Sequence, residues 1–286
     1  MKKILRAFAS LAACIAFSFL PGCGSHDETF AFGGYRFATD TFQQWKLPKS
    51  LREISGLAAT ADGRLFTHGD ERAEIYQIDY RDGKLVKSFR LGISSDSRPV
   101  KGDFEGIAVR DSELYLITSN GILYRSQIGG DGSTMPYQTF NSGAGDLCEV
   151  EGLAYRPQTD MLLIACKEVR KVEFEDKVVV LQWSPQTRRL ERDMSILINQ
   201  SSTGGRFSAS GISVSPRNGN LLLVSARQRR LLEVTPEAHV VAVLSLPMER
   251  YHRQTEGIEV TGSGTLVLAD EGGNKRGRLG TYRGRN

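Results

Sequence analysis

The sequence lacks the common signatures of hydrolases, kinases and redox enzymes. No Gly-x-Ser-x-Gly, His-Glu-x-x-His, P-loop, Cys-x-x-Cys or EF-hand loop occurs in its 286 residues. It is poor in histidine, with four residues. No segment shows the amphipathic pattern of a helix of three turns, which argues against an α/β fold. These absences remove several common enzyme classes and favour an all-β chain.

The first residues have the pattern of a segment that is removed. Basic residues at positions 2, 3 and 6 precede an apolar stretch at residues 7–20, which is too short to span a membrane. The stretch ends in Leu20-Pro21-Gly22-Cys23, which resembles a bacterial lipobox. We therefore predict a lipoprotein signal peptide at residues 1–22 and lipid attachment at Cys23, with simple secretion as the alternative.

The mature chain also lacks an excess of charge of either sign. Without Lys2, Lys3 and Arg6 it has 34 basic and 33 acidic side chains, so no nucleic-acid partner is expected. Gly24, rather than aspartate, follows Cys23, which favours the outer membrane, facing the periplasm, over inner-membrane retention. The expected partners are the membrane, through the lipid, and an unknown ligand or protein, and the protein is expected to be a monomer.

Cysteine is scarce, with four residues, of which Cys14 lies in the predicted signal peptide. Cys148 and Cys166 would face each other across one hairpin, and an oxidising periplasm would allow a disulfide. Strict residue counting leaves them a few positions out of register. The sequence therefore leaves open whether they form a disulfide or remain two buried thiols.

A short phrase that returns five times organises the rest of the chain. Each copy reads Xaa-Gly-Ile/Leu and opens a run typical of a β-strand. The glycines are 50, 46, 59 and 46 residues apart, the length of one four-stranded blade. This spacing predicts an all-β, five-bladed β-propeller over residues 35–286, preceded by a flexible tether at residues 23–34. The five glycines are Gly56, Gly106, Gly152, Gly211 and Gly257.

The two ends of the chain predict how the ring closes. The fifth repeat stops at its third strand, near residues 278–283, and nothing follows to supply a fourth. Residues 42–47 precede the first repeat as the last strand of a blade precedes each later one. We therefore expect this N-terminal strand to complete the last blade, so that no open edge remains between the terminal blades.

Three of the five copies carry glutamate before the glycine, at Glu105, Glu151 and Glu256. A ring places equivalent positions around one axis, so these carboxylates should converge. Carboxylates that share a small, partly dehydrated space repel one another unless a counter-ion is present. Calcium, which takes about 6–8 oxygen ligands in flexible geometry, suits such a site. The alternative is that they are ordinary channel residues, hydrogen-bonded to backbone amides.

The five repeats, from "ISGLAATADGRLFTHGDERAEIYQID" through "DFEGIAV", "EVEGLAYRPQTDMLLIACKE" and "ASGISVSPRNGNLLLVSA" to "QTEGIEVTGSGTLVLADEGG", resemble the SdiA-regulated family of bacterial envelope propellers. This family is distantly related to NHL-repeat propellers, and the resemblance covers residues 40–286. It implies a five-bladed propeller with a bound calcium ion and no established reaction.

The resemblance extends to the metal ligands. In the related gluconolactonase and senescence-marker group, the acidic or amide residue before Gly-Leu/Met/Pro on the inner strands holds a divalent metal. Because two of the five equivalent positions are serine here, waters or backbone carbonyl oxygens would complete the coordination. In this sequence these positions are Ser55, Glu105, Glu151, Ser210 and Glu256.

Two functions from different classes remain open at this point. The first is a non-enzymatic envelope lipoprotein whose calcium-centred propeller binds a ligand or partner. The second is a calcium-dependent hydrolase of an ester, lactone or phosphoester, in which the metal polarises the substrate and a histidine handles the proton. His68 and His252 are the candidates for that role, because His26 lies in the tether and His239 begins an outer strand.

Overall fold

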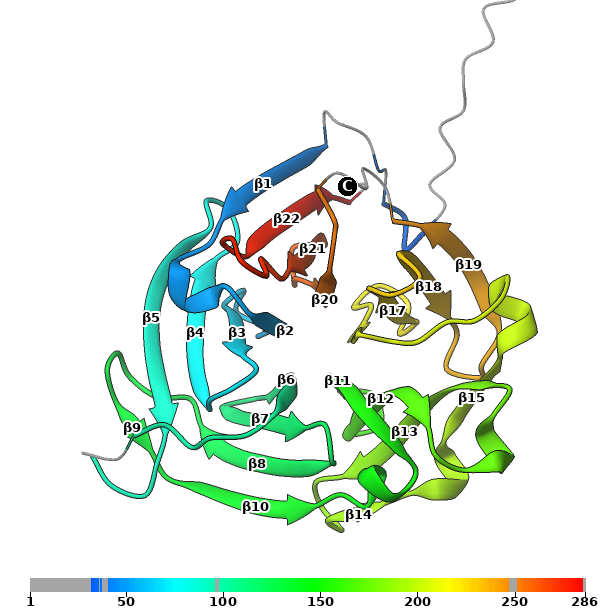
Figure 1. Ribbon diagram of the computed structural model, residues 1–286, viewed down its shortest axis with the longest axis horizontal. Coiled ribbons are helices and arrows are strands. Elements are labelled where there is room, and N and C mark those ends of the chain that lie inside the picture. The colour runs from blue at the N-terminus through cyan, green and yellow to red at the C-terminus, as the bar shows by residue number, and fades with distance from the viewer. Residues whose placement is uncertain (1–31, 36, 38–40, 96–97, 247–250, 285–286) are drawn as a thin grey trace, which may run out of the picture.

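The computed structural model describes residues 32–35, 37, 41–95, 98–246 and 251–284, which form five antiparallel blades around one axis (Figure 1). The predicted signal peptide and Cys23 lie outside these residues. None of the described helices is long and apolar enough to cross a membrane. The prediction of an all-β, five-bladed propeller is confirmed.

Each of the first three blades begins with its inner strand. The first consists of β2 (Ile54–Ala59), β3 (Leu65–Gly69), β4 (Glu74–Asp79) and β5 (Lys84–Leu91). The second consists of β6 (Phe104–Arg110), β7 (Glu113–Thr118), β8 (Ile122–Gln127) and β10 (Tyr137–Asn141). The third contains β11 (Cys148–Arg156), β12 (Met161–Val169), β13 (Lys177–Ser184), β14 (Arg189–Leu190) and β15 (Ile196–Asn199).

The last two blades complete the ring. The fourth consists of β16 (Gly211–Val214), β17 (Leu221–Ser225), β18 (Arg230–Val234) and β19 (Val240–Ser245). The fifth consists of β20 (Thr255–Val260), β21 (Thr265–Asp270), β22 (Arg278–Arg283) and β1 (Phe42–Lys46). The described helices are short 3-10 turns, namely η1 (Lys49–Leu51), η2 (Ala144–Asp146), η3 (Val172–Phe174), η4 (Arg192–Met194) and η5 (Gln200–Thr203).

The N-terminal strand closes the ring as predicted. Strand β1 pairs antiparallel with β22, with Phe42 opposite Tyr282, and forms the outer edge of the fifth blade (Figure 1). The rings of these two residues are 4.9 Å apart. Phe32 and Tyr35 are also buried against the fourth and fifth blades. Phe32 lies within the range predicted as tether, so contact with the propeller begins slightly before residue 35.

Two blades contain more strands than the four predicted. In the first, β9 (Thr134–Met135) leaves the second blade and pairs in parallel with β5. In the third, β13 pairs with both β14 and β15 along its length. Both additions cover the outer edge of a sheet, where unpaired backbone groups would otherwise be exposed.

The hydrophobic core is divided among the seams of the ring. Five clusters of buried side chains each draw residues from two neighbouring blades. The cluster between the second and third blades includes Trp183 and the disulfide between Cys148 and Cys166, whose Cα atoms are 5.7 Å apart. The pair that the sequence left open is therefore bonded. Cys148 lies directly opposite Val169 and Cys166 opposite Val150, and two register shifts lie on either side of Val150 in this ladder.

A pair of turn glycines in the first blade tests the contact of the closing strand. Gly83 and Gly63 both have positive φ, at 71° and 86°. A Cβ at Gly83 would overlap the Cβ of Trp45 on β1, whereas a Cβ at Gly63 would meet nothing within 4 Å. We expect Gly63→Ala to cost about 1–2 kcal/mol of unfolding free energy through backbone strain. Gly83→Ala should cost about 1–3 kcal/mol more through overpacking.

Denaturant unfolding of the two variants and the wild type measures the difference. Equal losses for both substitutions would mean that β1 does not pack tightly against the first blade. A larger loss for Gly83→Ala supports the observed seal between the N-terminal strand and the blade that follows it.

Candidate functional site

The repeated glycines hold the five inner strands close together around the axis. A Cβ at Gly106 would lie 2.6 Å from the backbone nitrogen of Leu153 on the next inner strand, and one at Gly211 would lie 2.6 Å from the carbonyl oxygen of Glu256. At the other three seams, the glycine faces the leucine or isoleucine side chain of the next blade. None of the five has positive φ, so glycine is needed here for close approach rather than for an unusual backbone conformation.

A β-bulge turns the residue before the glycine out of its ladder. In four of the five inner strands the register shifts at this residue, which has no partner on the second strand. A β-bulge bends the strand locally, so the side chain of the bulged residue can point away from the sheet. The bulged residues are Ser55, Glu105, Glu151 and Glu256.

Glu105 carries the strongest electrostatic perturbation of the three glutamates. Burial raises its pKa to about 9, and the negative charges of Glu151, Asp103 and Glu256 contribute further, while Lys167 opposes the rise. The carboxylates of Glu151 and Glu256 are therefore near enough to Glu105 to influence its protonation. Ser55 Oγ donates a hydrogen bond of 3.4 Å to Glu105 Oε2, so the first blade also faces this group.

The other two glutamates differ in their partners. Burial raises the pKa of Glu256 to about 7, opposed by a hydrogen bond of 3.0 Å from Gln254 Nε2. Glu151 is 5% exposed, and burial raises its pKa although Lys167 Nζ forms an ion pair with it. Lys167 is bulged out of β12 opposite the bulge at Glu151, so the two side chains meet. One lysine thus faces three carboxylates.

Sequence reasoning missed part of this cluster. Asp103 and Glu149 each raise the pKa of a neighbouring glutamate, and both lie just before an inner-strand Glu-Gly step. The repeated phrase gives no signal for Lys167, which lies on the second strand of its blade. Ser210, in contrast, donates to the carbonyl oxygen of Thr255 at 2.8 Å and accepts from the amide of Ala226, so its hydroxyl serves the backbone.

The donor chemistry of the cluster fits a hard divalent cation. Its groups are carboxylate oxygens, which calcium prefers, and a cation would relieve the repulsion that raises the pKa of Glu105. Among the described residues, no three Asp, Glu, His or Cys side chains are close enough to share one ion. Lys167 would have to release Glu151 before all three glutamates could serve as ligands.

The two histidine candidates lie in the protein interior. His68 is fully buried, its Nδ1 bonds the carbonyl of Gly69 at 2.9 Å, and burial lowers its pKa to about 4. His252 is equally buried between Asp270 (2.8 Å) and the hydroxyl of Tyr282 (2.7 Å). The structure brings neither ring into contact with the three glutamates, and a catalytic role for either stays a prediction.

Comparison with known proteins gives matches along most of the chain. The model of the family described as SdiA-regulated matches residues 30–274. Glutaminyl cyclase from Myxococcus xanthus superposes with a TM-score of 0.59 and 17% identity, over 84% of this chain and 94% of the other. PQQ-bound aldose sugar dehydrogenase from Streptomyces coelicolor gives 0.51 and 16%, over 84% and 98%. At these identities the two structures show a shared fold alone.

The raised glutamate pKa values predict how stability depends on pH in chelator-treated protein. The folded state holds protons on Glu105 up to about pH 9 and on Glu256 up to about pH 7, whereas the unfolded chain releases them near the ordinary glutamate pKa of 4.5. The folded state therefore binds more protons in this window, so the unfolding free energy should fall as pH rises from about 5 to 9. Denaturant unfolding across this range measures the slope.

Glu105→Gln should flatten this slope, because the amide cannot be deprotonated. The matched control is Glu237→Gln, which removes an exposed carboxylate from a turn of the fourth blade and should leave the slope unchanged. An equal pH dependence in wild type and Glu105→Gln would show that this carboxylate is not held in a protonating environment.

Proposed function

Because the chain belongs to the SdiA-regulated family of β-propeller proteins, we propose that it is a non-enzymatic binding protein of the bacterial cell envelope. Its lipid is attached at Cys23, and the glutamate end of its channel holds a calcium ion. The ion and the surrounding face bind a ligand or protein partner. When bound, calcium supplies a positive centre that can coordinate an oxygen atom of that ligand.

One observation carries the proposal. Three inner strands each turn a glutamate out of the ladder towards the same space, where burial and mutual repulsion raise the pKa of Glu105 to about 9. Keeping carboxylates together in this way is unfavourable unless a cation compensates them. Lys167 supplies one positive charge for three carboxylates. A dication would complete the compensation, with Glu105, Glu151 and Glu256 as its ligands.

Lys167 would compete with a metal ion for the carboxylate of Glu151. Its ammonium group forms ion pairs with Glu151 and, at 3.4 Å, with Glu149. For Glu151 to serve as a calcium ligand, Lys167 would have to release it and keep Glu149 or solvent as its partner. The lysine would therefore weaken calcium binding.

The hydrolase alternative has no comparable support. Acid or base catalysis needs a group within hydrogen-bond reach of the substrate. His68 and His252 are both fully buried, and the described contacts of each are with the protein interior. Binding is therefore the function that the geometry favours.

Calcium should stabilise chelator-treated protein. A ligand that binds only the folded state adds about 3–4 kcal/mol at a 100- to 1,000-fold excess over its Kd, so millimolar calcium should raise the Tm. Glu105→Gln combined with Glu151→Gln should abolish the rise, because it removes two of three charged ligands. Magnesium should have little effect, because it demands tighter octahedral geometry. Thermal unfolding monitored by circular dichroism measures these shifts.

Two further variants show whether the calcium effect arises at the glutamate cluster. Lys167→Met should increase calcium affinity, because Glu151 is then free of its competitor. The matched control Arg206→Met removes a base that pairs with Glu168 instead and should leave the affinity unchanged. If calcium shifts the Tm of the double glutamine variant as much as that of wild type, the glutamates are not the ligands and the proposal fails.

The lipid anchor has its own test. Cys23→Ser should move the protein from the membrane fraction to the soluble periplasmic fraction, because the acylated thiol is lost. In the wild type, separation of the two membranes should place the protein with the outer membrane. A wild-type protein that is fully soluble would refute the anchor, whereas an inner-membrane protein would refute the sorting alone.

A further inference from the structure

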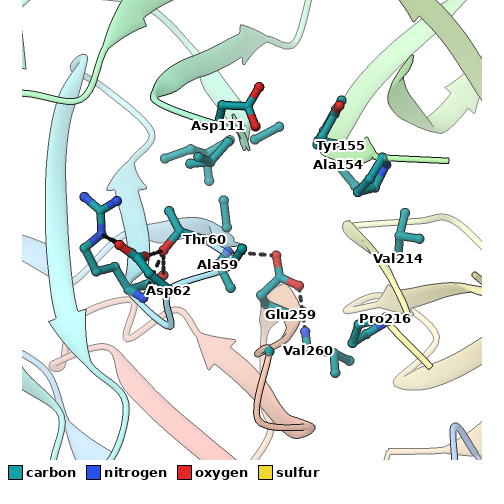
Figure 2. Close-up of a pocket in the computed structure, with 18 of the residues that line it drawn as sticks. Ala59, Thr60, Asp62, Asp111, Ala154, Tyr155, Val214, Pro216, Glu259 and Val260 are labelled. Atoms are coloured by element: carbon teal, nitrogen blue, oxygen red, sulfur yellow. Dashed lines mark hydrogen bonds and ion pairs between the residues drawn. The ribbon is translucent and has the colours of Figure 1, made fainter. Parts of the chain in front are cut away.

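A second cavity opens at the opposite end of the channel, where the inner strands end. It has a volume of about 520 Å³, within the range of small-molecule sites. Figure 2 shows Glu259 reaching towards Ala59 at this cavity, with Asp62, Asp111 and Val214 around it. We call it the Glu259 cavity.

The repeat explains both the space and the one acid that an inner strand contributes to it. The residue two positions after each repeated glycine is small in four blades, whereas in the fifth it is Glu259. All but Ser213 of this set line the cavity, and Ser213 contacts Glu259. The small residues therefore leave an open space at this level of the ring, and Glu259 places its carboxylate in that space. The set is Ala58, Ala108, Ala154, Ser213 and Glu259.

Glu259 is fixed by both neighbouring blades and keeps an acceptor site open. Its Oε1 accepts from Ser213 Oγ and from the amide of Val260, both at 2.6 Å. Its Oε2 accepts from the amide of Ala59 at 3.1 Å. A carboxylate offers about four lone-pair positions, so these three donors leave one, on Oε2. Burial raises the pKa of Glu259 to about 7. The hydrogen bonds from these donors act in the opposite direction but are the smaller effect.

The rest of the cavity combines apolar walls with a negative rim. Ile107, Val109 and Val214 are among the apolar residues that line it. Among its described lining residues Arg64 is the only base, and its Nε lies 2.9 Å from Asp62 Oδ2 in an ion pair. The carboxylates of Glu259 and Asp111 therefore leave the cavity with a net negative charge.

The Glu259 cavity is separate from the glutamate cluster. Beyond the Glu259 cavity the channel narrows to a space of about 10 Å³, lined by the repeated glycines, their leucine or isoleucine neighbours and, at the glutamate end, Ser55, Glu105 and Glu256. This is too small for anything larger than one water molecule. A ligand that enters by the Glu259 end therefore has to be recognised there, without the three glutamates.

We propose that the Glu259 cavity binds a small organic cation, a primary ammonium group on an apolar body. The ammonium donates to the open lone pair of Glu259 Oε2, and the apolar body lies against Ile107, Val109 and Val214. Charge complementarity selects the cation. Two carboxylates of the cavity have no ion-pair partner among the described residues, whereas its one described base is already paired. This site goes beyond the calcium-binding function and does not depend on it.

Calorimetry on the mature protein in chelator at about pH 8 tests the proposal. The probes are 2-phenylethylammonium and hexylammonium, with 2-phenylethanol and 3-phenylpropanoate as neutral and anionic controls. We expect the two ammonium compounds to bind with a Kd of about 1 mM or tighter, and each control at least tenfold more weakly. Because chelator is present throughout, the result is independent of whether the glutamate cluster binds calcium.

Glu259→Gln should weaken binding of the ammonium compounds at least tenfold, because it removes the charge and keeps the shape. Glu237→Gln, which removes an exposed carboxylate from the turn between β18 and β19, should change it less than twofold. If neither ammonium compound binds, or if the alcohol binds as tightly, the proposal is wrong. If Glu259→Gln binds the ammonium compounds as tightly as the wild type does, Glu259 only connects neighbouring blades through its hydrogen bonds and does not bind the ligand.

Nuclear magnetic resonance of the wild-type protein, labelled at its alanine methyl groups, provides a second test. Its result does not depend on whether Glu259→Gln folds. Addition of 2-phenylethylammonium should shift the signals of Ala58, Ala108 and Ala154, which line the cavity. The signal of Ala226, which lies outside it near Ser210, should not move. Shifts confined to residues outside the cavity would overturn the proposal.

Discussion

The close approach of five inner strands at their glycines is the constraint on which the rest of the structure depends. At each seam, the missing Cβ makes room for the next strand or its leucine or isoleucine, so a larger residue would push two blades apart. This contact sets the channel width and fixes the level of every other inner-strand residue. Residues one before the glycine then gather at one end of the axis, and residues two after it gather at the other.

The two ends acquire different chemistry from the same repeated phrase. At the first end, β-bulges turn three glutamates out of their ladders, and Lys167 forms an ion pair with Glu151. At the second end, small residues leave a cavity with Glu259 as its only inner-strand acid. The narrow glycine layer separates the two. Both proposed sites are thus built on the inner strands of one ring.

The fold could be predicted because its signal is periodic. The glycine spacing gave five blades, and the missing last strand of the fifth repeat identified β1 as the closing strand. An electrostatic influence of Glu151 and Glu256 on Glu105 could be expected from symmetry alone. Strands β9 and β15 carry no such period, because they pair at outer edges where the repeats differ.

Local irregularities account for what the sequence did not show. Two register shifts between β11 and β12 bring Cys148 and Cys166 together and turn Lys167 towards Glu151, and strict counting along regular strands predicts neither contact. His68 and His252, the candidates for proton transfer, are both buried, and the sequence could not show this because side-chain burial depends on packing between blades. The signal for the Glu259 cavity was present in the repeat, at the small residues two positions beyond each glycine.

The central claim is that the ring forces together carboxylates that need a cation, and that without one Glu105 keeps a proton. Calorimetric titration of chelator-treated protein with calcium near pH 7.5, in two buffers of different ionisation enthalpy, tests this most directly. The account predicts one bound ion per chain and a heat that differs between buffers, because Glu105 releases its proton on binding. Absence of binding, or binding with the same heat in both buffers, would contradict it.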